Sequence, residues 1–445
     1  MNCIRIGVLG SVDTGKSSII GVLKSGVLDN GKGSIRKLAM KHKHEIESGR
    51  TSCISHHNIY INDKLIVFID LAGHEAYLKT TIYGLNSLQL DYVIMMIGSN
   101  MGINKMTKEH FNLIRTVELP IIFIFNKIDL CPENIINNTY TDLKKLVNSR
   151  SGGKKELYIV ESPDMYSNES NINTLYVEET ENNTTIHLNN ANMCNNKVYM
   201  NTVDYKKTKA PLDWNIHYPL FFNSNKTGYG IDNLKNYLYN LPLKPVTIDK
   251  DKNVFIIQET YNVNGVGIVF FGYVKYGNIY KSQKLSIGPF KGKFYNVSIR
   301  SVRNVIDQDV ENLTQGMIGC IAIKQLSKEF NFKRDNIRKG MYLTSTPVCC
   351  NEFIARVHIL HHPSTIKQKY QSTMHCGSVT QAIELLEIMN IKNNTEDKSL
   401  LRTGDFAKVK FRFVFRPEYI EDNARFIFRE NNTKGVGKIL SAITT

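Results

Sequence analysis

Residues 4–25 read IRIGVLGSVDTGKSSIIGVLKS, and this stretch decides the fold of the first part of the chain. A strand-like run, IRIGVL, leads into GSVDTGKS, which matches the pattern GxxxxGK[ST], and a helix-like run follows. In a strand–loop–helix setting the backbone N–H groups of such a loop surround phosphates, and the helix N-terminus favours their negative charge. Lys16 is then expected to reach the β- and γ-phosphates, and the Ser17 hydroxyl to bind Mg²⁺. The predicted phosphate-binding residues are Gly10, Ser11, Val12, Asp13, Thr14, Gly15, Lys16, Ser17 and Ser18.

A second motif, LIVFIDLAGHE at residues 65–75, has the features of a strand that ends beside a triphosphate. Asp70 ends the apolar run and Gly73 follows three residues later. A carboxylate at this place can face the Mg²⁺ shell, and the Gly73 N–H can face the γ-phosphate. We therefore expect Asp70 and Gly73 to complete the phosphate end of the site.

Two further motifs predict the base. An apolar run ends in NKID, with Asn126, Lys127 and Asp129, and FFNSNKTGYG supplies a second set, Ser224, Asn225 and Lys226. A carboxylate at 129 can accept hydrogen bonds from guanine N1–H and its exocyclic amine, which adenine does not offer in that arrangement. Four motifs in this order, each at a strand end, predict GTP or GDP as the ligand, with Mg²⁺.

The patterns divide the chain into an α/β part and a β part. Apolar runs at 4–9, 65–69, 92–97, 121–125 and 219–222 alternate with helix-length stretches, which is typical of an α/β P-loop domain with a mainly parallel sheet. Later residues form short β-rich runs broken by Gly, which predicts two antiparallel β-barrels. We expect a nucleotide-binding domain at 1–246, with an exposed Asn-rich insertion at about 167–205, then barrels at 250–345 and 350–445.

The charge is distributed unevenly along the 445 residues. Residues 1–249 hold 27 basic and 24 acidic side chains (net +3), and residues 250–445 hold 29 and 17 (net +12), which together give +15. A basic excess of this kind allows a nucleic-acid partner without establishing one. No apolar run approaches the roughly 18 residues of a membrane helix, the strand-like start leaves no room for a signal peptide, and the eight Cys include no CxxC. We expect a cytoplasmic monomer without membrane contact.

At these motifs the sequence resembles the translational GTPases of the elongation-factor-Tu type, and among them the subgroup called GTP-binding protein one. HEIESGRTSCIS (44–55), NVNGVGIVFFGYVKYGNI (262–279) and TKGVGKI (433–439) extend the resemblance. It implies GTP hydrolysis used as a conformational switch, with RNA or a ribonucleoprotein such as tRNA or the ribosome docking on the barrels.

The resemblance also implies roles for single residues. Thr51 would join the Mg²⁺ shell and sense the γ-phosphate, Asp70 would hold Mg²⁺ through water, and Gly73 would be a pivot. His74 would position the attacking water, and Asp13 would help to hold a monovalent cation. The expected metal ligands are thus Ser17, Thr51 and Asp70, and the expected catalytic residues are Lys16, Thr51, Gly73 and His74.

One departure from the family pattern leaves the function open. Arg50 stands where factor-Tu-type proteins have an isoleucine that forms a hydrophobic gate with the residue matched by Val12. This position and the basic barrels motivate an alternative, a GTP-binding RNA adaptor with little catalysis. A nucleotide kinase or ATPase is disfavoured, because NKID and SNKTG would have no purpose in one.

Two other groups of side chains have competing interpretations. We interpret His42, His44, His56 and His57 as surface histidines of a switch loop rather than a metal site, since their spacing matches no zinc pattern. In KVKFRFVFR (408–416) the period-two alternation predicts Lys408, Lys410, Arg412 and Arg416 on one strand face. Such a stripe could follow an RNA backbone, although a merely solvated face would look the same in the sequence.

Overall fold

The computed structural model contains two compact units, one with the α/β sheet and one with both β-barrels. The residues it describes are 3–40, 51–61, 64–149, 155–160, 174–180, 183–189, 213–214, 216–243, 252–326, 330, 332–391, 399–430 and 432–444. Arg50, His42 and His44 lie outside them. Within these ranges no helix combines the length and the apolar character needed to cross a membrane.

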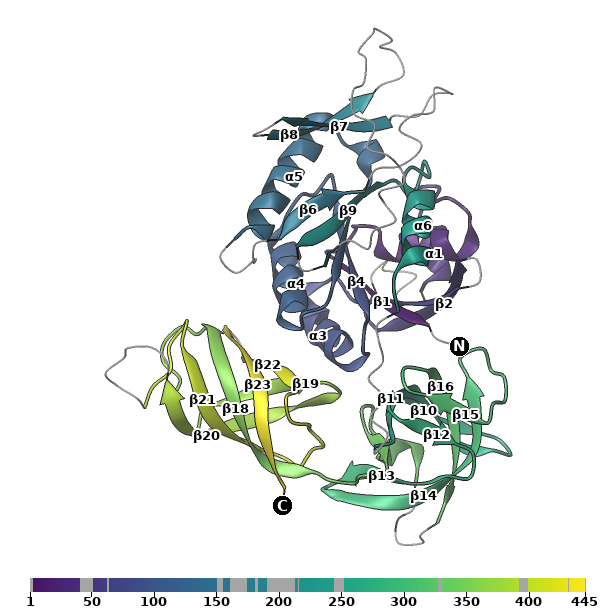
Figure 1. The fold of residues 1–445 in the computed structure, drawn as a ribbon, viewed down its shortest axis with the longest axis vertical. Helices are drawn as coiled ribbons and strands as arrows, with labels where there is room; N and C mark the ends of the chain where they lie inside the picture. Colours follow the sequence, from purple (N-terminus) through teal and green to yellow (C-terminus); the bar gives the residue numbers. More distant parts are fainter. Residues whose placement is uncertain are drawn as a thin grey trace. The chain divides into compact units, whose positions relative to one another are not determined.

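The first unit is built on a seven-stranded sheet with the order β2-β3-β1-β4-β5-β9-β6 (Figure 1). Its strands are β1 (Ile4–Gly10), β2 (Ser55–Ile61), β3 (Lys64–Asp70), β4 (Tyr92–Gly98), β5 (Ile121–Asn126), β6 (Glu156–Ile159) and β9 (His217–Asn223). All neighbouring pairs are parallel except β2 with β3. The mainly parallel sheet expected from the sequence is therefore confirmed.

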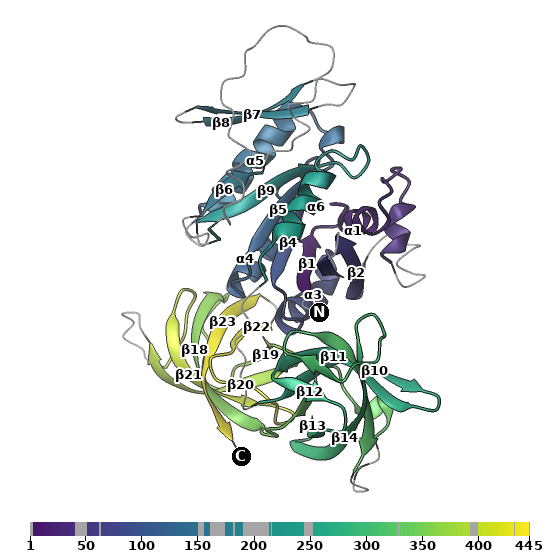
Figure 2. The same ribbon diagram turned by 45° about the vertical axis from the view of Figure 1, so that its right-hand side comes forward.

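Helices cover both faces of this sheet (Figures 1 and 2). They are α1 (Lys16–Ser25), α3 (Leu78–Ser87), α4 (Lys105–Thr116), α5 (Glu133–Val147) and α6 (Ile231–Asn240), with short 3₁₀ turns η1 (Ile35–Leu38), η2 (Glu75–Tyr77) and η3 (Ile128–Leu130). Ile20 of α1 and Leu234 of α6 belong to one buried cluster with Ile94 of β4. On the other face, Phe111 of α4 contacts the rings of Phe123 and Tyr218.

The Asn-rich segment contains a regular element that its composition did not predict. Strands β7 (Thr174–Thr180) and β8 (Asn183–Asn189) pair as an antiparallel hairpin. The hairpin lies beside α5 (Figure 1). The rest of the expected insertion falls outside the described residues.

The second unit begins with a closed barrel, in the order β10-β11-β16-β14-β13-β17. Its elements are β10 (Val254–Val263), β11 (Gly267–Tyr276), β13 (Lys284–Phe290), β14 (Lys293–Asn304), β16 (Ile318–Gln325) and β17 (Tyr342–Thr344), with a small accessory pair β12 (Asn278–Tyr280) and β15 (Asn312–Thr314) and the turn η6 (Arg334–Asn336). The alternation of apolar residues places Phe255, Ile257 and Phe270 inside the barrel.

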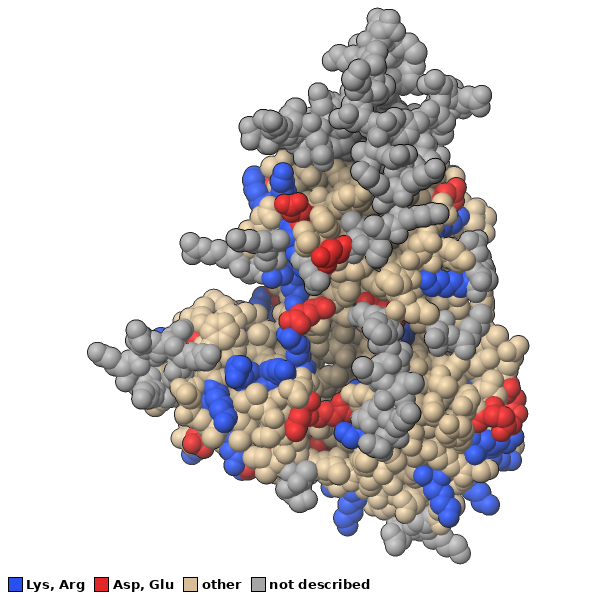
Figure 3. All heavy atoms as spheres, viewed as in Figure 1, with Lys and Arg blue, Asp and Glu red and all other residues tan. Residues whose placement is uncertain are grey.

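The second barrel has the order β18-β21-β20-β19-β22-β23. Its strands are β18 (Cys350–His361), β19 (Gln371–Cys376), β20 (Val379–Ile391), β21 (Phe406–Phe413), β22 (Arg425–Glu430) and β23 (Thr433–Thr444). Phe353, Phe411 and Phe426 pack against one another in its core. The expectation of two antiparallel barrels is confirmed, and Lys and Arg side chains gather over the second one (Figure 3).

A buried carboxylate joins the two barrels. Glu418 follows β21 and is 5% exposed, and its Oε1 accepts hydrogen bonds from Arg338 of the first barrel (3.4 Å) and Arg416 (2.9 Å). Burial raises the pKa of Glu418, and the two guanidinium charges oppose that rise. A second pair, Lys275 and Glu421, links the barrels at 2.5 Å.

The resemblance segment TKGVGKI has a packing reason for its first glycine. A Cβ on Gly435 of β23 would lie 2.0 Å from the ring of Phe428, which is nearly fully buried. We predict that Gly435→Ala lowers the free energy of unfolding by about 1–3 kcal/mol, since the ring has no space to move into. Chemical denaturation followed by circular dichroism measures this. Lys438→Ala, on an exposed position of the same strand, is the control and should change it by less than about 0.5 kcal/mol; equal midpoints for the two variants would contradict the prediction.

Candidate functional site

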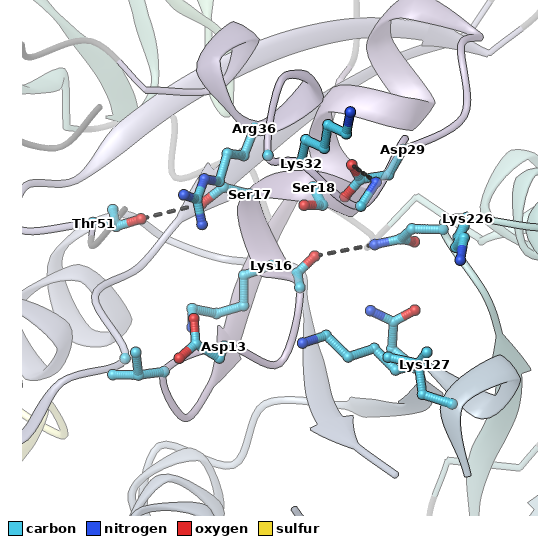
Figure 4. A pocket seen from close by; sticks show the side chains of 18 of the residues that line it. Asp13, Lys16, Ser17, Ser18, Asp29, Lys32, Arg36, Thr51, Lys127 and Lys226 are labelled. Atoms are coloured by element: carbon cyan, nitrogen blue, oxygen red, sulfur yellow. Dashed lines mark hydrogen bonds between the residues drawn. The ribbon is translucent and has the colours of Figure 1, made fainter. Parts of the chain in front are cut away.

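A pocket of about 340 Å³ opens at the edge of the sheet where β1, β5 and β9 end (Figure 4). Parallel strands bring their carboxyl ends to one edge, so loops that are far apart in the sequence meet there. The predicted residues that line the pocket are Val12, Asp13, Gly15, Lys16, Ser17, Ser18, Thr51, Gly73, His74, Asn126, Lys127, Asp129, Asn225 and Lys226. The sequence therefore identified most of its wall.

The loop after β1 curls around the buried Lys16. Gly15 has φ 91° directly before α1, and a Cβ there would lie 2.2 Å from the Asn126 amide, so this position requires glycine. The Lys16 amino group donates to the Ser11 carbonyl at 2.8 Å. Burial lowers the pKa of Lys16, and the carboxylates of Asp70 and Asp13 oppose the shift. A further anion beside this lysine, in addition to the two carboxylates, would offset more of the cost of burying its charge.

Three oxygen side chains meet at one end of the pocket. The Ser17 hydroxyl donates to Asp70 Oδ2 at 2.7 Å, the Thr51 hydroxyl donates to the same oxygen at 3.2 Å, and the two hydroxyl oxygens are 3.1 Å apart. Asp70 is fully buried at the end of β3. Hydroxyl and carboxylate oxygens are the ligands that Mg²⁺ prefers, so the donor set fits that ion.

Gly73 and His74 lie at the same end. A Cβ on Gly73 would lie 2.4 Å from the Gly10 carbonyl and 2.5 Å from Lys16 Nζ, so no side chain fits between them. His74 caps η2, and its Nδ1 accepts a hydrogen bond from the Ala76 N–H at 3.1 Å. In the neutral ring an accepting Nδ1 leaves the proton on Nε2. His74 can then present an N–H donor to the pocket.

The opposite end of the pocket holds the predicted base-binding residues. The Ser224 hydroxyl donates to Asp129 Oδ1 at 2.6 Å and fixes that carboxylate. Lys127 has φ 63°, which turns the chain between Asn126 and η3. The Asn126 amide donates to the Thr14 carbonyl at 2.9 Å, and the Asn225 amide donates to the Gly15 carbonyl at 3.4 Å. The loops predicted to bind the base and the phosphates are thus joined directly.

Five predicted site residues support the pocket without lining it: Gly10, Ser11, Thr14, Asp70 and Ser224. A Cβ on Gly10 would lie 2.4 Å from the Met96 carbonyl. The carbonyls of Ser11 and Thr14 accept from Lys16 and Asn126, and Asp70 and Ser224 orient the side chains described above.

Sequence reasoning missed one wall of the pocket. Asp29, Gly31, Lys32, Gly33, Arg36 and Met40 line it from the segment between α1 and β2, and Leu130 lines it from η3. The Asp29 N–H donates to the Asn225 carbonyl at 2.8 Å and attaches this segment to the loop predicted to bind the base. The run DNGKG (29–33) signals a turn after a helix but matches none of the four motifs. Asn104 was also missed: it caps α4 and donates to the Ser11 hydroxyl at 3.1 Å.

The interpretation of His56 and His57 as switch-loop surface residues is wrong. Both lie in β2, where His57 is buried and His56 is half-buried. Buried residues alternate with more exposed ones along this strand. The two adjacent histidines near its start made that alternation hard to recognise in the sequence. The described part of the chain contains no group of three or more His, Cys, Asp or Glu residues arranged to hold a metal.

Known families match both ends of the chain. The model of the elongation factor Tu GTP binding domain matches residues 1–242, and that of the elongation factor Tu C-terminal domain matches residues 346–443. GTP-binding protein 1 of Xenopus laevis is 34% identical, covering 98% of this chain and 63% of that protein. GTP-binding protein 2 of Homo sapiens is 31% identical, covering 99% of this chain and 70% of that protein. The chain thus spans about two thirds of the length of these relatives.

Solved structures share the fold. The translation elongation factor SelB from Methanococcus maripaludis, in complex with the GTP analogue GppNHp, aligns with a TM-score of 0.67 at 16% identity, covering 100% of this chain and 80% of SelB. A bacterial selenocysteine-specific elongation factor, EF-Sec, aligns with a TM-score of 0.66 at 16% identity, covering 100% of this chain and 59% of that one. These likenesses concern the fold, whereas the family match over residues 1–242 and the relatives above 30% identity show that the chain belongs to the elongation-factor-Tu-like family of GTPases.

Proposed function

We propose that this protein binds GTP and GDP with Mg²⁺ and hydrolyses GTP as a conformational switch. One observation carries the proposal: a single pocket is lined at one end by Ser17 and Thr51, whose hydroxyl groups both bind the buried Asp70, and at the other end by a fixed carboxylate, Asp129. A nucleoside triphosphate needs both ends. The family match at residues 1–242 supports the same ligand.

Guanine would be selected by Asp129. Its carboxylate is an acceptor only, so it pairs with the two adjacent N–H donors of guanine and not with adenine. Ser224 holds the carboxylate in place at 2.6 Å, and the stem of Lys127 would lie along the base. Asn225 and Lys226 would close the site around the base.

Hydrolysis would proceed by attack of water on the γ-phosphorus. The water oxygen forms a bond to phosphorus, the bond from phosphorus to the β–γ bridging oxygen breaks, and the electron pair stays on GDP. The water proton leaves with inorganic phosphate or to solvent. Bound Mg²⁺ would neutralise phosphate charge, with Ser17, Thr51 and Asp70 as the residues that hold it. Lys16 and the Gly73 N–H would contact the γ-phosphate.

His74 would orient the water and not act as a base. Its Nδ1 is occupied by the Ala76 N–H, so the neutral ring offers an Nε2–H donor to the water oxygen. Phosphoryl transfer through a loose transition state depends mainly on positioning and charge neutralisation, so a donor is sufficient. Loss of the γ-phosphate would release the segments that carry Thr51 and His74, which is the switch.

An RNA or ribonucleoprotein partner is the second part of the proposal, and cross-strand register in the second barrel favours it. Arg356 of β18 pairs with Lys408 of β21 on one side and Lys438 of β23 on the other. All three side chains are exposed and form no ion pair with a described carboxylate. We call these three residues the cationic row. Like charges directly opposite one another destabilise a sheet, so a polyanion that lies across the row would relieve the repulsion.

The stripe expected along β21 is largely neutralised. Lys410 pairs with Glu352 at 2.7 Å and Arg412 with Glu384 at 3.4 Å, while Arg416 lies beyond the strand and binds Glu418. Lys408 alone of this stripe joins the cationic row, which runs across the strands. The relatives named elongation factors support an RNA-bearing partner. The proposed protein is a cytoplasmic monomer.

Base choice can be tested at Asp129. We predict that Asp129→Asn weakens GTP binding at least about tenfold and strengthens binding of xanthosine triphosphate, since the amide can donate to the 2-oxo group of xanthine. Titration with fluorescent nucleotides measures both affinities. Asp142→Asn, on the exposed face of α5, is the matched control. Unchanged affinity for both nucleotides would refute guanine recognition by this residue.

The role of His74 has a separate test. His74→Ala should reduce single-turnover GTP hydrolysis with ribosomes present by about 10²-fold or more, while GTP and GDP affinities stay within about threefold, because the ring orients water and does not hold the nucleotide. Lys79→Ala serves as the control, since Lys79 is exposed in the first turn of α3 and does not line the pocket. If ribosomes and aminoacyl-tRNA do not stimulate GTP hydrolysis by the wild-type protein, the result favours the alternative, a GTP-binding RNA adaptor with little catalysis.

The cationic row predicts a salt-dependent effect. Changing Arg356, Lys408 and Lys438 to Gln should weaken binding to total tRNA or rRNA fragments and reduce the slope of log affinity against log salt by about 2, because each lost phosphate contact removes about 0.7–0.9. GTP binding should stay unchanged. The charge-matched control changes Lys281, Lys284 and Lys293, exposed on the first barrel. Equal slopes for the two triple variants would show that only net charge matters.

A further inference from the structure

Arg36 enters the pocket from a wall that no nucleotide motif predicted. It lies in η1 and is one of the pocket-lining residues, together with Ser17, Thr51 and His74. In Figure 4 its side chain extends toward Ser17 and Thr51, away from Lys127 and Lys226 at the other end. Its guanidinium is therefore on the phosphate side of the proposed nucleotide site.

The guanidinium N–H groups of Arg36 have no hydrogen-bond acceptor among the described residues. The residue is half-buried, and the structure gives its side chain neither an ion pair nor a hydrogen bond with any described residue. Arginine is always charged and has five N–H donors in a planar fork that matches phosphate oxygens. The oxygens of an anion in the pocket would give these donors hydrogen-bond partners.

The backbone that carries Arg36 is fixed. Ile35 is 5% exposed and belongs to the main core cluster, and a Cβ on Gly21 of α1 would lie 2.5 Å from the Ile35 carbonyl. Ala39 and Met40 are buried just after η1. On the other side, Gly33 has φ 77° and leaves room for Arg36, whose Nε lies 2.7 Å from the place of a Gly33 Cβ. The arginine thus stands on a short, well-packed turn.

We propose that Arg36 is a catalytic arginine supplied in cis, which donates hydrogen bonds to the γ-phosphoryl oxygens as the bond to the β–γ bridging oxygen breaks. The inference rests on the proposed GTP hydrolysis and adds a residue to it. Negative charge on the phosphoryl and bridging oxygens grows and spreads in the transition state, and a second cation that lines the same pocket as Lys16 would stabilise it. As in the hydrolysis proposed above, the electron pair of the broken bond stays on GDP, and the water proton leaves with inorganic phosphate or to solvent.

The contribution of Arg36 should be larger in the transition state than in the ground state. Arg36→Ala is expected to lower single-turnover GTP hydrolysis by at least about tenfold while changing GDP affinity less than about threefold. Arg36→Lys should restore little, because a point charge does not reproduce the planar fork. Lys37→Ala is the matched control, since Lys37 is an exposed cation on the same turn and does not line the pocket.

A readout besides turnover separates this role from a structural one. Aluminium fluoride with GDP and Mg²⁺ imitates the transferring phosphoryl group, so wild type and Lys37→Ala should bind GDP more tightly with fluoride, and Arg36→Ala should lose at least about tenfold of that gain. The inference would be overturned if aluminium fluoride increased the GDP affinity of Arg36→Ala as much as that of the wild type. It would also be overturned if Arg36→Ala lost GDP affinity and thermal stability to a similar extent, since that would indicate a structural role. If wild type itself neither binds nor hydrolyses GTP, the proposed function fails first, which is a distinguishable result.

Discussion

The buried carboxylate of Asp70 is the constraint on which the proposed phosphate end of the site depends. It accepts hydrogen bonds from two hydroxyl groups that come from different parts of the chain, Ser17 at the start of α1 and Thr51 ahead of β2. Its position is fixed because β3 pairs in parallel with β1, in register from Ile4 with Ile66 to Val8 with Asp70. The core of the sheet therefore fixes the carboxylate around which the two hydroxyl groups meet.

The same logic explains what the sequence could predict. Strands β1, β3, β5 and β9 are short, strongly apolar runs, and each is followed by a motif whose residue types serve one chemistry. Because parallel strands end at one edge, recognising the motifs was enough to place Lys16, Asp129 and Asn225 around one pocket. Both barrels could be expected from β-rich runs with turn signals.

What the sequence concealed depends on contacts between distant segments. The wall at 29–40 has no motif of its own, and its role follows from a backbone hydrogen bond between Asp29 and Asn225. Lys410 and Arg412 looked like free cations, yet Glu352 and Glu384 on neighbouring strands neutralise them. The cationic row appears only once β18, β21 and β23 are in register, since its members are separated by tens of residues. Alternation along one strand cannot show what lies across it.

Glu418 has a consequence for how force passes through the barrel unit. The Glu418 carboxylate is 5% exposed and binds a guanidinium from each barrel. This contact opposes separation of the barrels, because moving them apart would leave a buried charge without its partner. The two barrels should thus behave as one stiff lever. A large ligand bound to the outer face of the second barrel would therefore rotate both barrels together. A substitution of Arg338 would weaken the contact between the barrels without changing the ligand-binding face.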